Sequence, residues 1–197
     1  MDQQLTLDPA RSALVLIDLQ NSNVRRDLAP YSAQDVVGNC VLLAQEMRER
    51  AGLVIYVHVL LNEMQQAPAD APLRPPGAPP PPPDASWLVP EAGVEAQDLV
   101  IAKRQWGAFY GTDLELQLRR RGIHTLVMGG IATNFGVEST ARAAHDLGFA
   151  LVFAEDAMSS FDATAHLFAC TGIFPRMGRV RTTRTLIDLL QAGTGAA

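Results

Sequence analysis

The sequence predicts an α/β fold, in which helices cover both faces of a six-stranded parallel sheet in a three-layer α/β/α arrangement. Two observations predict it: short, nearly unbroken apolar runs, and between them longer segments whose apolar residues recur every three or four positions. With 197 residues, 48% of them hydrophobic, the chain is long enough to bury one sizeable core. We therefore expect one domain over residues 1–197.

The strands are expected where apolar runs have few polar breaks. A strand of a parallel sheet is buried on both faces, so it reads as a continuous run of Val, Ile and Leu rather than as an alternation. "SALVLIDL" and "LVIYVHVLL" are such runs. The six expected strands are residues 12–19, 53–61, 98–103, 124–131, 149–156 and 179–182.

Helices are expected between these strands, where the apolar residues follow helical spacing. The clearest start of a helix is at Thr112, because Thr112 and Glu115 have the spacing of a capping box. The arginines at 119–121 then lie at the negative end of the helix dipole, which favours a structural role for them. The located helices are residues 33–50, 112–121, 136–147 and 185–190.

A proline-rich excursion at residues 65–93 interrupts this alternation, and it contains five consecutive prolines at 79–83. Proline is excluded from the interiors of both helices and sheets. The favoured interpretation is a stiff surface segment with polyproline II character, because only Trp87 and Leu88 offer it an anchor. The other interpretation is a lid over the active site or a contact between subunits.

Composition narrows the class of partner. A net charge of -5 with 19% charged residues gives no basic patch for nucleic acid, so a small-molecule substrate is expected. Cys40 and Cys170 lie far apart without CxxC spacing, which indicates neither a disulfide framework nor a zinc site. No signal peptide or membrane span is recognisable, and we expect a cytoplasmic protein that does not bind membranes.

Ligands of open parallel sheets bind beyond the carboxyl ends of the strands, where the strand order reverses. With the expected order 3-2-1-4-5-6, the first and fourth strands flank that point. Asp18, Lys103, Thr133 and Asn134 follow or end strands there. Lys103 belongs to a strand about 10 Å from the first, so its flexible stem must reach inward. Other roles are open for both charged residues: an Asp at the end of a strand can cap the following loop, and a single Lys is more often a solvated surface charge than a catalytic group.

The stretch "GGIATNFGVEST" brings backbone N–H groups together before a helix, an arrangement suited to an anion or a developing oxyanion. Gly136 stands where a nucleophile would be expected, although a glycine there also eases a tight turn. Trp106 and Phe109 precede this region in the chain and are equally suited to walls of a pocket or to pieces of the core.

Three segments together resemble the isochorismatase-like hydrolases, also called the cysteine hydrolase superfamily. They are "ALVLIDLQN", the run from "IAKRQWGAFYGT" to "FAEDAMSS", and "RVRTTRTLIDLL". The resemblance covers nearly the whole chain except the proline-rich excursion. It implies an isochorismatase-like fold and, because members are commonly oligomeric, a homo-oligomer.

By resemblance, the Asp, Lys and Cys of the family's amidases correspond to Asp18, Lys103 and Gly136, so the thiol nucleophile is absent. The resemblance also implies a cis peptide between Ile131 and Ala132, with the N–H groups of Ala132 and Gly136 as an oxyanion hole. The residues expected to contact substrate are Gln20, Trp106, Phe109, Thr133 and Asn134.

Isochorismatases of the family also carry glycine at the nucleophile position, and their Asp is thought to protonate the enol carbon of a vinyl ether. The resemblance thus implies that Asp18 is a general acid and that Lys103 orients an anionic substrate. The turn itself is closer to the amidase version, so a catalytically silent member that binds a metabolite or serves as an assembly subunit is the alternative. Nicotinamidases bind a metal after the second strand, but only His58 is present here, so we expect no metal and no cofactor.

Overall fold

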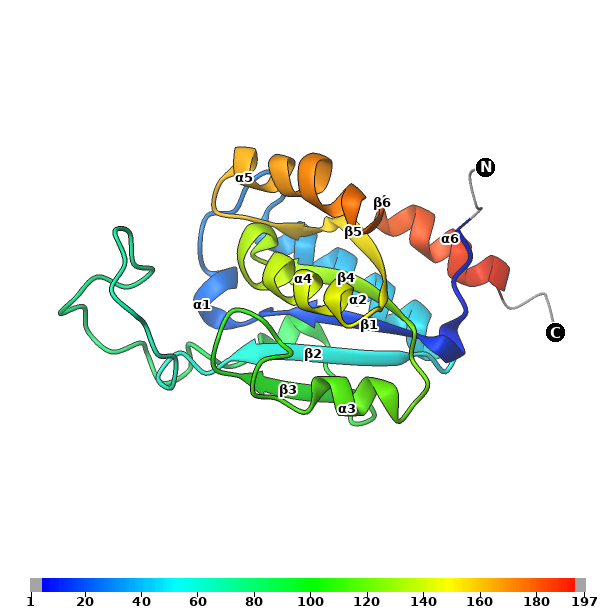
Figure 1. Ribbon diagram of the computed structural model, residues 1–197, viewed down its shortest axis with the longest axis horizontal. Coiled ribbons are helices and arrows are strands. Elements are labelled where there is room, and N and C mark those ends of the chain that lie inside the picture. The colour runs from blue at the N-terminus through cyan, green and yellow to red at the C-terminus, as the bar shows by residue number, and fades with distance from the viewer. Residues whose placement is uncertain (1–4, 194–197) are drawn as a thin grey trace.

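The computed structural model describes residues 5–193 as six parallel strands in one sheet, in the order β3-β2-β1-β4-β5-β6 (Figure 1). This confirms the predicted class and strand order, and the predicted bounds differ by only a few residues. The strands are β1 Ser12–Ile17, β2 Leu53–Val59, β3 Leu99–Lys103, β4 Thr125–Ile131, β5 Ala150–Ser159 and β6 Gly178–Arg181.

The helices form a layer on each face of the sheet (Figure 1). One core lies between the sheet and helices α2 and α6, and the second lies between the sheet and helices α3 and α4 together with the segment after α5. Short helices α1 and α5 were not located from the sequence. The helices are α1 Asn21–Val24, α2 Ala33–Glu49, α3 Leu114–Arg119, α4 Glu138–Asp146, α5 Ala163–Phe168 and α6 Thr183–Gly193.

Strand β1 lies at the centre of both cores. Leu14 and Leu16 belong to the core under α2, whereas Val15 and Ile17 belong to the opposite core. Successive side chains of a strand point to opposite faces, so a strand covered on both sides needs apolar residues at every position. The unbroken run of the sequence follows directly from this burial.

The start of α3 differs from the prediction. Thr112 does not form the expected capping box with Glu115, because its hydroxyl donates to the Ala108 carbonyl at 2.5 Å and accepts from the Leu114 amide. The helix therefore begins at Leu114 rather than at Thr112. Glu115 pairs instead with Arg119 one turn later, at 3.4 Å.

Residues 65–83, here called the proline-rich arm, belong to a long loop that projects beyond the carboxyl end of β2, at the left of Figure 1. The rest of the excursion packs against the body. Trp87 is not an anchor, since 65% of it is exposed, whereas Leu88 is half-buried and packs against the core; Ala85, Val89 and Ala92 are also buried. Their small side chains give little periodic signal in the sequence.

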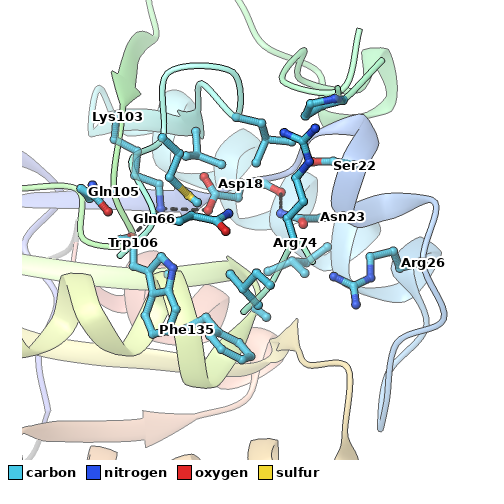
Figure 2. A pocket seen from close by; sticks show the side chains of 18 of the residues that line it. Asp18, Ser22, Asn23, Arg26, Gln66, Arg74, Lys103, Gln105, Trp106 and Phe135 are labelled. Atoms are coloured by element: carbon cyan, nitrogen blue, oxygen red, sulfur yellow. Dashed lines mark hydrogen bonds and ion pairs between the residues drawn. The ribbon is translucent and has the colours of Figure 1, made fainter. Parts of the chain in front are cut away.

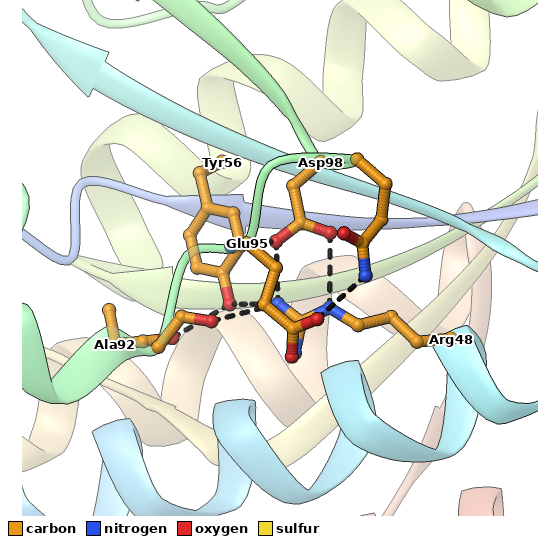
Figure 3. A network of polar contacts seen from close by, with 7 residues as sticks. Arg48, Tyr56, Ala92, Glu95 and Asp98 are labelled. Carbon is orange, nitrogen blue, oxygen red and sulfur yellow. Dashed lines mark hydrogen bonds and ion pairs between the residues drawn. The ribbon is translucent and has the colours of Figure 1, made fainter.

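A buried polar network ties the end of this excursion to α2 and β2 (Figure 3). The Arg48 guanidinium donates to both carboxylate oxygens of Asp98, at 3.1 and 2.6 Å, and to the Gly93 carbonyl at 2.9 Å. The Tyr56 hydroxyl accepts from Arg48 and donates to the Ala92 carbonyl at 2.7 Å. One cation thus holds three chain segments together.

Within residues 5–193, the helices are all too short or too polar to cross a bilayer.

Candidate active site

Asp18 follows β1 directly and turns the chain out of the sheet. Its φ of 52° is left-handed, a conformation that Asp tolerates better than most residues. Its N–H donates to the Val57 carbonyl at 2.8 Å, and its carbonyl accepts from the Asn23 side chain at 3.1 Å. These bonds fix the backbone at the switch point between β1 and β4, where the sequence placed a ligand site.

Lys103, the last residue of β3, reaches across β2 to Asp18 (Figure 2). Its ammonium lies 2.8 Å from Asp18 Oδ2 and donates to the Trp106 carbonyl at 2.6 Å. Both side chains of the pair are buried, with 1% of Lys103 and 8% of Asp18 exposed. The side chains of Lys103 and Asp18 together therefore bridge the two strand spacings that separate β3 from β1.

Burial sets the proton affinity of Asp18. Loss of solvent raises the pKa of its carboxyl, and the nearby Lys103 ammonium lowers the pKa in part; the net direction is upward. One carboxylate oxygen, Oδ1, is buried without a hydrogen-bond partner among the described residues. An unpaired buried carboxyl oxygen is costly unless a ligand or a proton satisfies it.

Gly136 lies in a π-helical turn, Thr133–Val137, and α4 begins only at Glu138 rather than at residue 136. A Cβ added at Gly136 would lie 3.0 Å from Asp18 Oδ2 and 3.1 Å from the Lys103 ammonium. The residue at this position therefore controls the space beside the ion pair. The peptide between Ile131 and Ala132, just before this turn, is cis.

These residues share a cavity of about 440 Å³ (Figure 2). Asp18, Lys103, Ala132 and Gly136 all line it. Trp106, Phe135 and Phe161 form an aromatic wall, in which the Trp106 and Phe135 rings meet edge to face with centroids 5.1 Å apart. Further lining comes from the proline-rich arm, at Leu73, Arg74 and residues 78–82.

Two residues expected to contact substrate are structural instead. Gln20 is fully buried, and its amide accepts from the Val59 N–H at 2.8 Å and donates to the Ala85 carbonyl at 3.1 Å. It joins β1, β2 and the excursion and does not line the cavity. Phe109 packs its ring 5.9 Å from that of Phe149, in the core beneath α3.

Two residues of the turn that contains Gly136 are also absent from the cavity lining. The Thr133 hydroxyl is fully buried and lies 2.9 Å from Nδ1 of His166 on α5. The Asn134 side chain accepts a hydrogen bond from the Ser160 hydroxyl. Both side chains therefore fasten the turn to the segments that follow β5, and neither residue is among those that line the cavity.

Reasoning from sequence missed several cavity residues, among them Phe135, Phe161, Arg26 and Arg74. Phe135 directly precedes Gly136, so its position in the turn was a usable signal. The other three come from loops, in which no periodicity predicts the direction of a side chain.

No group of three or more His, Cys, Asp or Glu residues suited to a metal ion is present in the described part of the chain. His58 lies beside the cavity region, and its Nδ1 is 2.7 Å from the Ser86 carbonyl.

Replacing Lys103 by Gln is expected to raise the pKa of Asp18 further. The substitution removes the charge that lowers this pKa and leaves the burial that raises it. A ¹³C NMR titration of the aspartate carboxyls would measure the shift, with Asp18→Asn to assign the resonance. Arg104→Gln, a neighbouring exposed position, is the control, and an unchanged or lower pKa in Lys103→Gln would contradict the expectation.

Comparison with known proteins places this chain in a family. The model of the isochorismatase domain matches residues 12–185. The isochorismatase family protein YwoC of Bacillus subtilis is 44% identical over 191 residues, which cover 95% of this chain and 98% of that protein. The structure of an isochorismatase family protein from Burkholderia thailandensis has a TM-score of 0.88 at 43% identity, over 94% of this chain and 98% of that one.

A shorter similarity connects the chain to an amide-cleaving enzyme. Ureidoacrylate amidohydrolase RutB of Yersinia enterocolitica is 46% identical over 70 residues, which cover 36% of this chain and 30% of that protein. The family model and the near-full-length relatives decide the assignment: this chain belongs to the isochorismatase family of hydrolases.

Proposed function

We propose that this protein is an isochorismatase-type hydrolase that cleaves an enol ether or a related bond in a small carboxylated metabolite, with Asp18 as general acid and no thiol nucleophile. One observation carries the proposal: Asp18, whose buried carboxyl has a raised pKa and one oxygen without a hydrogen-bond partner, lines a cavity together with Gly136. A carboxyl that keeps its proton toward neutral pH is suited to protonate a substrate.

In the first step the Asp18 carboxyl transfers its proton to the terminal carbon of the enol ether. The electrons of the C=C bond form the new C–H bond, and the positive charge is shared by the ether carbon and the ether oxygen. Oδ1 is the candidate donor, because Oδ2 is held by the Lys103 ammonium.

Water then attacks the cationic carbon and returns one proton to the Asp18 carboxylate. The resulting hemiketal breaks its C–O bond to the departing alcohol, giving a ketone and the alcohol, so one water is consumed overall. Lys103 stabilises the carboxylate form of Asp18 between these steps.

Lys103 has three donors, and two of them are engaged by Asp18 and the Trp106 carbonyl. The space left by the missing side chain at Gly136 lies 3.1 Å from its nitrogen. We propose that a substrate oxygen or the attacking water occupies this space. The N–H groups of Ala132 and Gly136, whose residues line the cavity, are the proposed additional donors.

The proposal is tested by comparing hydrolysis of isochorismate with that of a panel of amides and esters. We expect hydrolysis of the enol ether and little hydrolysis of simple amides. The two cysteines are buried, and neither lines the cavity, so no other thiol replaces the absent nucleophile there.

Substituting Gly136 by Ala or Cys is expected to lower enol-ether hydrolysis about 10- to 100-fold, because small displacements of reacting groups are costly. In both variants the new Cβ would press on Asp18 and Lys103 at 3.0 and 3.1 Å. Rates with the same substrate panel measure the effect. A gain of amide or ester hydrolysis by Gly136→Cys alone would show instead that the surrounding groups support thiol catalysis.

The second candidate is a catalytically silent member that binds a small metabolite. The absence of a thiol beside an amidase-like turn favours it, as does the partial similarity to an amidohydrolase. No turnover of any substrate in the panel, combined with thermal stabilisation by a carboxylated ligand, would select this alternative.

A further inference from the structure

The cavity walls carry more positive than negative charge. Arg26, Arg74 and Lys103 line the cavity, and Asp18 supplies its single carboxylate. Asp18 and Lys103 pair with each other at 2.8 Å, so the two guanidinium groups remain uncompensated. In a chain whose net charge is -5, this local excess of positive charge points to an anionic ligand.

Arginines that neighbour cavity residues in the sequence form ion pairs, in contrast to Arg26 and Arg74. Arg25, adjacent to Arg26, lies 2.8 Å from the Asp84 carboxylate, and Arg104, adjacent to Lys103, lies 2.6 Å from Glu63. Arg26 and Arg74 form no ion pair with any residue in the range 5–193. The paired arginines lie outside the cavity lining and serve as matched controls.

Arg26 and Arg74 are nevertheless held in place. The Cζ atom of Arg26 lies over the Phe161 ring, 3.6 Å from its centroid, in a cation–π contact. Arg74 donates to the Ala78 carbonyl at 2.7 Å, within the proline-rich arm. The prolines at 79–82 that follow restrict the backbone of the arm and reduce the entropy lost on binding.

The positions of Arg26 and Arg74 relative to Asp18 indicate the shape of the ligand. In Figure 2 both arginines lie to the right of Asp18, whereas Lys103 and Gln105 lie to its left, with Trp106 and Phe135 below. The Phe135 ring lies between those of Trp106 and Phe161, with centroids 5.1 and 6.1 Å away. A flat, unsaturated body fits such an aromatic wall.

We infer that Arg26 and Arg74 form an anion-binding rim, and that the protein selects small unsaturated carboxylates whose carboxylate lies away from the bond that Asp18 attacks. Arg74 is then a specificity-determining residue supplied by the proline-rich arm, not by the sheet. The position of the reacting bond in this inference rests on the proposed function, whereas anion binding at the rim does not.

The test uses binding rather than turnover. Cinnamate and its neutral analogue cinnamamide are titrated into the full-length wild-type protein by calorimetry. We expect cinnamate to bind more tightly, and its affinity to fall as salt is added. Arg74→Gln and Arg26→Gln should each weaken cinnamate about 10-fold, as expected for a charge-assisted hydrogen bond, and leave cinnamamide nearly unchanged.

Arg25→Gln and Arg104→Gln are the controls, and both should bind cinnamate like the wild type. Equal or weaker binding of cinnamate than of cinnamamide by the wild type would overturn the inference. Equal losses of affinity for cinnamate and cinnamamide in Arg74→Gln would also overturn the inference, because the arm would then only shape the wall of the cavity. A different result would contradict the proposed function, namely full turnover by Asp18→Asn. That result would leave these binding measurements unaffected.

Discussion

Asp18→Asn is expected to lower enol-ether hydrolysis about 10²- to 10⁴-fold, the range that a positioned general acid contributes. The amide has nearly the same shape but no proton that it can transfer to carbon. Because burial raises the pKa of Asp18, the wild-type rate should also fall as pH rises through that pKa, where the acid form is lost. Steady-state rates as a function of pH measure both effects.

The substitution also leaves the Lys103 ammonium without its counter-charge, in a side chain that is 1% exposed. Loss of fold must therefore be separated from loss of chemistry. The double variant Asp18→Asn/Lys103→Gln removes both charges, and circular dichroism establishes whether each protein is folded. Asp84→Asn, which breaks the more exposed pair with Arg25, is the control. A folded Asp18→Asn protein with nearly wild-type rates would sink the proposed mechanism.

How well the sequence predicts a residue of this site depends on where that residue lies in the fold. Asp18 and Lys103 follow or end buried strands, and parallel strands bring their carboxyl ends to one edge, so the apolar runs alone indicated that the two could meet. The left-handed turn at Asp18 and the reach of Lys103 to 2.8 Å needed the structure.

Side chains on loops were predicted less well, for a physical reason. Thr133 and Asn134 are polar residues in the right turn, yet their hydrogen bonds to His166 and Ser160 turn them toward the segments after β5. Arg74 reaches the cavity because the proline-rich arm supplies part of its wall. Such positions depend on long-range packing, which leaves no periodic pattern in the sequence.

The same distinction applies to the helices. The strands were located because burial on both faces demands apolar residues at every position. The capping box at Thr112 was a local pattern, and it does not form because the Thr112 hydroxyl accepts from the Leu114 amide instead of the Glu115 amide. Helix α5 begins at a local signal that was overlooked, since the Asp162 side chain accepts from the Ala165 amide at 2.8 Å.

Arg48→Met is expected to lower the free energy of unfolding by about 3–5 kcal/mol, because it leaves a buried carboxylate without its partner. The side chain of Asp98 is 1% exposed, and that of Arg48 is 11% exposed. Met keeps the unbranched stem, so the loss reports on the guanidinium rather than on packing. Urea denaturation followed by circular dichroism measures the change.

The matched control is Arg104→Met, whose pair with Glu63 is 52% exposed on both sides and should change stability by at most about 1 kcal/mol. If the uncompensated Asp98 charge causes the loss, Arg48→Met/Asp98→Asn should recover part of it, since the asparagine oxygen can still accept from the Glu95 amide. A double variant no more stable than Arg48→Met would mean that the bonds to Gly93 and Tyr56, together with the ion pair to Glu95, carry the effect. The network would then act mainly by fastening the end of the proline-rich excursion, whose arm lines the cavity.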